Sequence, residues 1–206
     1  KCALTFGDAD SPIEPPERIS LPLDRSMLAA LARLVDDATT AFEAYDYARA
    51  LERTEGFFWR FCDDYLELVK TRAYDESDPE GAASARAALA VALSALHRLF
   101  APFLPFTTDE VWSWWMDGSV HSASWPDPAE LLPLAAGTSA DALELAGQVL
   151  SELRGAKSAA KASMRAEVSL AVVTDTPERL ELLAGVLDAI VATGNVAELR
   201  TQVGDC

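Results

Sequence analysis

The stretch HRLFAPFLPFTTDEVWSWW, residues 97–115, ends one helix and begins another. The first helix is expected to stop before Pro102, because the residue preceding a proline avoids the helical region of backbone space. The second is predicted to start within FTTDEV, where Thr107 is a suitable N-cap and Glu110, three residues later, completes a capping box. The stretch therefore predicts a sharp helix–turn–helix corner.

Aromatic side chains crowd this corner. Phe106 precedes the predicted N-cap and Val111 follows it, which is the arrangement of a hydrophobic staple. We therefore expect Phe100, Phe103 and Phe106 to fill the inside of the bend. On this interpretation the corner has a structural role, because it turns a helical bundle back on itself.

The chain before the corner has the apolar spacing of three helices. They are predicted over residues 25–40, with Asp24 as N-cap, over residues 45 or 47 to 73, and over residues 82–100. The segment YDESDPEG separates the last two. The inner face of the second helix is predicted to consist of Leu51, Phe58, Phe61, Cys62, Tyr65 and Val69.

The chain after the corner has a different pattern of apolar residues. A loop is followed by a helix from residue 139 or 141 to about 164, and AEVSLAVVTD then alternates apolar residues as a strand does. The segment TPERLELLAGVLDAIVAT predicts a helix with Pro177 in its first turn, and NVAELR a short strand. The predicted fold is mainly α. It consists of a proline-rich connector over residues 1–24, a helical bundle over residues 25–136 and a small α+β unit over residues 137–206.

Composition limits the function classes. Half of the 206 residues are hydrophobic, and 17 Lys and Arg against 33 Asp and Glu give a net charge of −16. Such a charge argues against a protein that coats nucleic acid, although it permits a local basic stripe. No apolar run approaches the roughly 20 residues of a membrane span, and the opening residues do not resemble a signal peptide. The three scattered cysteines, Cys2, Cys62 and Cys206, fit a reducing cytosol, and the first residue, Lys1, suggests a fragment or a processed chain.

No catalytic constellation is present in the sequence. Phosphate-binding loops, dinucleotide fingerprints and nucleophile elbows are missing, and His97 and His121 have no acid or thiol partner at motif spacing. Asp63 and Asp64 are adjacent on a predicted helix, where their side chains diverge by about 100°. We therefore predict no catalytic residue, metal site or cofactor in this chain.

Two basic features stand out against the acidic background. The first lies on the second predicted helix and comprises Arg49, Arg53 and Arg60 beside Trp59, with Lys70 and Arg72 at its end. Trp59 and Arg60 fall off the inner face, which suits stacking on an unpaired base and holding its phosphate. The alternative is an exposed face with Trp59 packed on a neighbour.

The second basic feature is LRGAKSAAKASMR. Arg154, Lys157, Lys161 and Arg165 recur at spacings of three and four, which predicts a stripe of cations along one side of a helix. Four like charges favour an anionic partner, and the small residues between them would let a phosphate backbone approach. The alternative is a solvated helix face.

The segment YDYARALERTEGFFWRFCDDYLELVKTRAY resembles the long helix of the anticodon-binding domain in class I aminoacyl-tRNA synthetases. LDRSMLAAL is similar to the start of that family's first bundle helix, LHRLFAPFLPFTTDEVW to its corner, and SVHSASWPDP to its loop ending in Trp-Pro. FFWRFCDDYLELVK and VLSELRGAKSAAKASMRAEV are most similar to the valyl-tRNA synthetases. The resemblance covers about residues 1–200.

The resemblance implies a C-terminal, non-catalytic region that grips the anticodon stem-loop of tRNA(Val). The parent enzyme would use ATP, with magnesium, and valine, and its catalytic and editing domains would precede this chain. We expect a cytoplasmic monomer without membrane contact. Two alternatives stay open: the same role in an isoleucyl or leucyl enzyme, and a helical protein-interaction module that binds no RNA.

Overall fold

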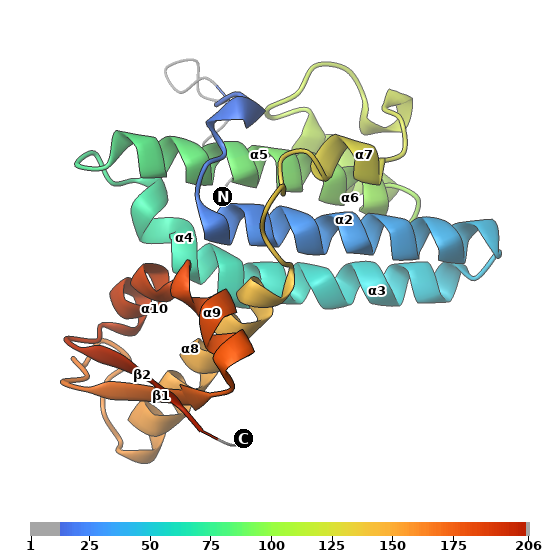
Figure 1. Cartoon of the computed structure of the whole chain (residues 1–206). Coiled ribbons are helices and arrows are strands. Elements are labelled where there is room, and N and C mark those ends of the chain that lie inside the picture. The colour runs from blue at the N-terminus through green and yellow to red at the C-terminus, as the bar shows by residue number, and fades with distance from the viewer. Residues whose placement is uncertain (1–12, 205–206) are drawn as a thin grey trace.

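A computed structural model describes residues 13–204. Long helices lie side by side in a bundle, and a smaller unit of short helices and two strands packs against one end of it (Figure 1). This confirms the predicted fold class, a helical bundle followed by a small α+β unit. Within the described residues no helix is both long enough and apolar enough to cross a membrane.

The bundle follows the predicted order of helices, and its bounds are α2 (Pro22–Glu43), α3 (Tyr47–Arg60), the π-helical turn η2 (Phe61–Tyr65), α4 (Leu66–Ala73) and α5 (Pro79–Phe100). The predicted second helix is confirmed as a continuous run through α3, η2 and α4. Of its predicted inner face, Phe61, Tyr65 and Val69 are buried, whereas Leu51, Phe58 and Cys62 are half-buried. Single π turns within helices are frequent at functional sites, which draws attention to η2.

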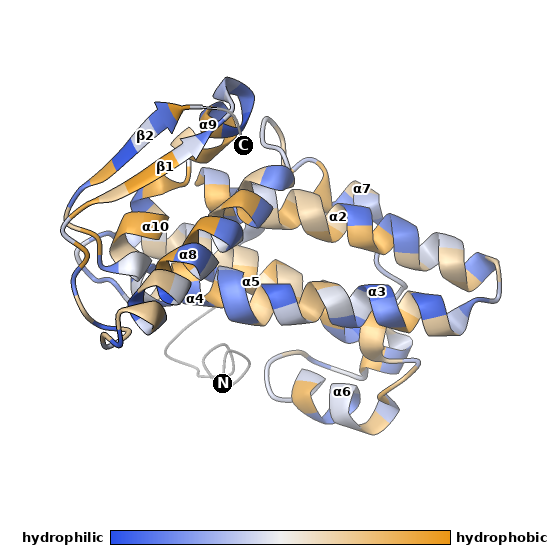
Figure 2. Cartoon of the chain, turned by 90° about the horizontal axis from the view of Figure 1, so that it is seen from below, coloured by the Kyte–Doolittle hydropathy of each residue, from blue (hydrophilic) through white to orange (hydrophobic). Residues whose placement is uncertain are grey.

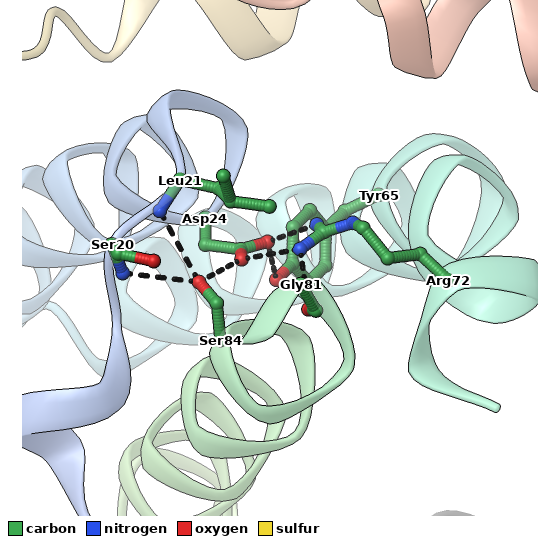
Figure 3. Close-up of polar contacts among 7 residues, drawn as sticks. All are labelled: Ser20, Leu21, Asp24, Tyr65, Arg72, Gly81 and Ser84. Atoms are coloured by element: carbon green, nitrogen blue, oxygen red, sulfur yellow. Dashed lines mark hydrogen bonds and ion pairs between the residues drawn. The ribbon is translucent and has the colours of Figure 1, made fainter. Parts of the chain in front are cut away.

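The prediction that Asp24 is an N-cap is wrong. Leu21 holds the cap position, and Asp24 lies inside the first turn of α2 with no exposed surface. Its carboxylate accepts hydrogen bonds from the Tyr65 hydroxyl at 2.8 Å, the Ser84 hydroxyl at 2.6 Å and the Arg72 guanidinium at 2.9 and 2.6 Å (Figure 3). The cluster of Asp24, Tyr65, Arg72 and Ser84, called here the Asp24 cluster, joins α2, η2, α4 and α5.

The Asp24 cluster also holds the chain that leads into the bundle. The Ser84 hydroxyl oxygen accepts the backbone N–H groups of Ser20 and Leu21 at 3.1 and 3.2 Å (Figure 3). The short helix η1 (Pro16–Arg18) runs beside α5, and Glu14 forms an ion pair of 2.9 Å with Arg86. Of the predicted connector, residues 13–24 are therefore fastened to the bundle, and the rest, with Cys2, lies outside the described residues, as does Cys206.

The corner is built differently from the prediction. Helix α6 (Pro105–Trp112) begins at Pro105 with Leu104 at the cap, so the predicted cap at Thr107 is wrong. Starting the helix earlier places Phe106 in its first turn, where the ring is 89% exposed, and the predicted staple does not form. Phe100 is buried and Phe103 half-buried, the latter against Phe42 at a ring distance of 5.6 Å.

The inside of the corner is filled by Trp112 and Trp115, with the half-buried His97 between them. The His97 ring lies 6.2 Å from the Trp112 ring and 6.1 Å from that of Trp115, and its Nδ1 is buried with no hydrogen-bond partner among the described residues. Burial therefore lowers the pKa of His97 from 6.5 to about 4. The imidazole is neutral at pH 7.

We expect His97 to make folding stability sensitive to mild acid. The unfolded chain takes up a proton near pH 6.5 and the folded chain only near pH 4. Stability is therefore lost as pH falls through this window, by about 2 kcal/mol after allowance for partial exposure. His97→Leu should flatten the curve of unfolding free energy between pH 7 and 4, measured by urea denaturation. A slope in His97→Leu equal to that of the wild type would contradict the prediction.

The α+β unit is reached through η3 (Val120–Ser122) and α7 (Pro128–Leu131), and it contains α8 (Asp141–Ala159), β1 (Ala171–Asp175), α9 (Pro177–Ala184), α10 (Leu187–Gly194) and β2 (Leu199–Val203). The two strands are parallel, with Ala171 opposite Leu199. The predicted helix of residues 176–193 is broken into α9 and α10. The predicted helix to residue 164 ends at Ala159, and Lys161 just beyond this end adopts a left-handed φ of 53°.

Candidate nucleic-acid interface

A groove of about 210 Å³ runs between α2, α3 and the start of α8. Its floor includes Phe57 and Phe61, which are 4% and 5% exposed and whose rings stack at 6.3 Å. Its rim carries both signs of charge, with the cations and acids Arg33, Arg53, Arg60, Asp37, Asp64, Asp141 and Glu144. The groove therefore combines an apolar floor with a charged rim.

A second hollow of about 200 Å³ lies at the tip of the hairpin formed by α2 and α3. It is lined by Thr40, Asp46 and Arg49 among others, and it shares Asp37 and Arg53 with the first groove. The two hollows therefore follow one another along the hairpin. We call them together the hairpin groove.

Three arginines on one face of α3 follow the hairpin groove. Arg49, Arg53 and Arg60 are separated by four and seven residues, so their side chains fall within about 40° of one another around the helix. All three are exposed. The spacing predicted a basic strip on this helix, and the structure brings its three arginines to one groove.

Arg33 on α2 extends this cationic strip across the groove, and sequence reasoning missed it. Its guanidinium forms an ion pair with Asp141 at 2.8 Å, and the hydrogen bond from Arg33 lowers the pKa of that carboxyl. The side chain remains 64% exposed, so the pair can open to an anionic ligand at little cost. A lone arginine in an amphipathic helix gave no signal, because its neighbours in the groove come from distant segments.

Asp64 lies at the inner end of the groove, in η2. Burial raises the pKa of its carboxyl, and the neighbouring cations Arg154 and Arg60 partly offset that rise. The groove thus offers guanidinium donors beside carboxylate acceptors. A nucleobase edge, which carries donors and acceptors, and a phosphate, which needs cations, can both be held by such a set.

Trp59 and Lys70 do not line the groove. The Trp59 side chain is 61% exposed, but it points about 100° around α3 from Arg60, so the two cannot hold one nucleotide from the same side. Lys70 on α4 forms an ion pair of 2.6 Å with Glu67. Arg72, placed in the same basic feature by the sequence, is instead committed to the Asp24 cluster. RNA contact by Trp59 and Lys70 stays a prediction.

The prediction that the second basic feature forms a stripe of cations along one helix is wrong. Lys157 is 6% exposed, and its ammonium donates to the Met164 and Gly194 carbonyl oxygens at 3.1 and 2.7 Å. Lys161 and Arg165 lie beyond the end of α8, and Arg154 donates to the Asp63 carbonyl at 3.4 Å and lies 3.8 Å from the Glu67 carboxylate. The helix ends after Lys157 anchors the following loop, so the four cations are scattered.

Comparisons with known proteins found a matching family model and several similar relatives. Residues 24–173 match the family model described as the anticodon-binding domain of tRNA ligase. The chain is 54% identical over 205 residues to a valine–tRNA ligase of Thermobifida fusca (strain YX), covering 100% of this chain and 23% of that protein. It is 50% identical to the valine–tRNA ligases of Leifsonia xyli (22% of that protein) and Salinispora tropica (23%), covering 91% of this chain in each case. The chain thus spans less than a quarter of the length of these relatives.

Proposed function

The chain belongs to the anticodon-binding domain family of tRNA ligases, within the branch of the valine–tRNA ligases, and from this premise we propose that its hairpin groove grips the anticodon loop of tRNA(Val). The observation that carries the proposal is the alignment of Arg33, Arg49, Arg53 and Arg60 along one groove of an acidic molecule, beside the carboxylates that also line that groove. The arginines would hold phosphates of the loop.

An unpaired base would enter the hairpin groove between the arginines. The apolar floor offers contact to the flat face of the base, and Asp37, Asp64 and Glu144 offer acceptors to its amino groups. Single-stranded loops are the parts of RNA whose bases can be splayed out and read in this way. Acidic surface that lacks such arginines would repel RNA, so the groove would select both position and orientation.

The rest of the reaction is proposed to take place outside this chain. In a full-length valine–tRNA ligase, ATP with magnesium would activate valine, and the acylated product would be checked at an editing site. This domain would contribute affinity and the choice of tRNA. We propose a monomer in the cytoplasm as its working form.

The test is binding of the 206-residue chain to a tRNA(Val) transcript, measured by fluorescence anisotropy at 50 and 200 mM salt. Three phosphate contacts would reduce affinity roughly 20- to 40-fold between these concentrations. A changed anticodon base should weaken binding by about 5- to 160-fold, because each lost base contact is worth about 1–3 kcal/mol.

Transcripts of tRNA(Ile) and tRNA(Leu) serve as matched competitors in the same assay. Preference for the valine transcript supports the proposal, and preference for either competitor would move the chain to the isoleucyl or leucyl alternative. Equal affinity for wild-type and altered anticodons, or no binding at 50 mM salt, would favour a protein-interaction module instead.

A further inference from the structure

The outer edge of β1 borders a groove that is separate from the hairpin groove. We propose that this second groove, between β1 and α8, takes an additional β-strand supplied by another segment of a full-length valine–tRNA ligase. The strand would pair with the free edge of β1. The inference rests on family membership and is independent of how the hairpin groove reads RNA.

The lining shows that an edge of the sheet, rather than a face, borders this groove. The groove has a volume of about 660 Å³. Every residue from 166 to 175 lines it, whereas no residue of β2 does. Successive residues of a strand point to opposite faces, so a run of consecutive lining residues means that the backbone edge is presented. Figure 2 shows β1 as the strand nearer to α8.

The backbone groups on this edge are aimed into the groove. Ala171 donates its N–H to the Glu198 carbonyl at 2.9 Å, and Asp175 accepts from the Gly204 N–H at 3.1 Å. In a parallel ladder the bonding residues alternate, so Ala171, Val173 and Asp175 face β2 while Val172 and Thr174 face away from it. Within residues 13–204, β1 pairs in a sheet with β2 alone.

A two-stranded parallel sheet is an incomplete structure on physical grounds. Parallel sheets occur buried, and two strands alone are marginally stable in water. Exposed edges are usually blunted by lysine, proline or a bulge, but the sequence of β1, AVVTD, contains neither lysine nor proline. Leu170 and Val172 are instead 44% and 50% exposed beside the open edge.

The opposite wall fits the side chains that an added strand would present. Leu145, Val149 and Leu153 of α8 line the groove and would contact alternate residues of the strand. Glu152 and Glu167 are exposed at the rim of the same groove. The occupant is therefore an extended segment with apolar residues at alternate positions and a Lys or Arg placed to meet a rim carboxylate.

Linkage to the same polypeptide explains how one short strand could stay bound. A free peptide of about five residues would bind weakly, because it must lose its conformational freedom on pairing. A segment of the same chain has an effective concentration that can reach the millimolar range. The relatives are more than four times as long as the stretch they share with this chain, so such an enzyme has the residues to supply the strand.

Amide hydrogen exchange tests the proposal in the full-length enzyme and in the 206-residue chain. In the shorter chain, Val172 and Thr174 should exchange quickly and Ala171 and Val173 slowly. In the full-length enzyme Val172 and Thr174 should slow by about 100-fold. Equally fast exchange in both proteins would overturn the proposal, and protection that rises with concentration of the shorter chain would assign the edge to a second copy instead.

Proline variants give a second readout with a matched control. Val172→Pro removes an N–H that faces the groove, and Thr201→Pro removes one that by the same alternation faces the opposite, free edge of β2. In the shorter chain the two variants should melt alike. In the full-length enzyme Val172→Pro should melt several degrees lower than Thr201→Pro, and equal melting there would overturn the assignment of the strand to this edge.

Discussion

Replacing Asp24 by Asn is expected to lower the free energy of unfolding by about 3–5 kcal/mol, the largest stability effect that we expect from a single substitution in this chain. The carboxylate has no exposed surface and holds three side chains from three helical segments. Asn keeps the shape but removes the charge, which leaves the Arg72 guanidinium in a largely buried place without its counterion. Breaking a buried pair by removing one partner is more costly than never having built it.

The electrostatics of the Asp24 cluster agree with this expectation. Burial lowers the pKa of Arg72, but the hydrogen bonds and charge of Asp24 outweigh that effect and raise it overall. Burial and the adjacent Asp24 charge both raise the pKa of Tyr65, so its hydroxyl stays protonated and donates. The cluster is therefore one buried negative charge shared among neutral and cationic donors.

Urea denaturation of Asp24→Asn against Asp36→Asn would measure the effect. Asp36 lies on the exposed face of the same helix, so its variant should change stability by less than about 0.5 kcal/mol. The double variant Asp24→Asn with Arg72→Met should be less destabilised than the sum of the single variants, because the second change removes the orphaned charge. Additive losses, or an Asp24→Asn variant as stable as Asp36→Asn, would contradict the role assigned to the cluster.

The Asp24 cluster also shows which features of the fold could not be predicted from the sequence, and why. Helical spacing predicted α2 to α5 because each helix repeats its apolar residues locally. An aspartate near a helix start is equally consistent with an N-cap and with a buried first-turn residue. The hydrogen bonds from Tyr65, Arg72 and Ser84, which lie 41 to 60 positions away in the sequence, decide between these two possibilities.

The candidate site likewise has one part that could be predicted from the sequence and one part that could not. The spacing of Arg49, Arg53 and Arg60 could be read from one helix, and these residues do line the hairpin groove. The stripe at Arg154 to Arg165 depended on α8 continuing past Ala159, through an alanine-rich segment without glycine or proline. Its end is set by tertiary contacts, since the Lys157 ammonium binds the carbonyls of Met164 and Gly194.

The second large effect that we expect from substitutions in this chain is on RNA affinity. Changing Arg53 and Arg60 together to Gln should weaken binding of tRNA(Val) by about 100-fold at 50 mM salt, and should reduce the slope of log affinity against log salt by nearly 2. Both side chains are exposed, so the variant should fold with near wild-type stability. Circular dichroism melting would verify folding before fluorescence anisotropy measures the affinity.

The matched control is Lys161→Gln with Arg165→Gln, which removes the same charge from exposed residues beyond the end of α8. If RNA is attracted only by the total charge of the molecule, the two double variants should lose affinity equally. If the hairpin groove holds phosphates directly, the control should stay within about twofold of wild type, because unpaired surface charges outside a contact are screened within roughly 10 Å. A larger loss in the control would show that the scattered cations, and not the hairpin groove, meet the RNA.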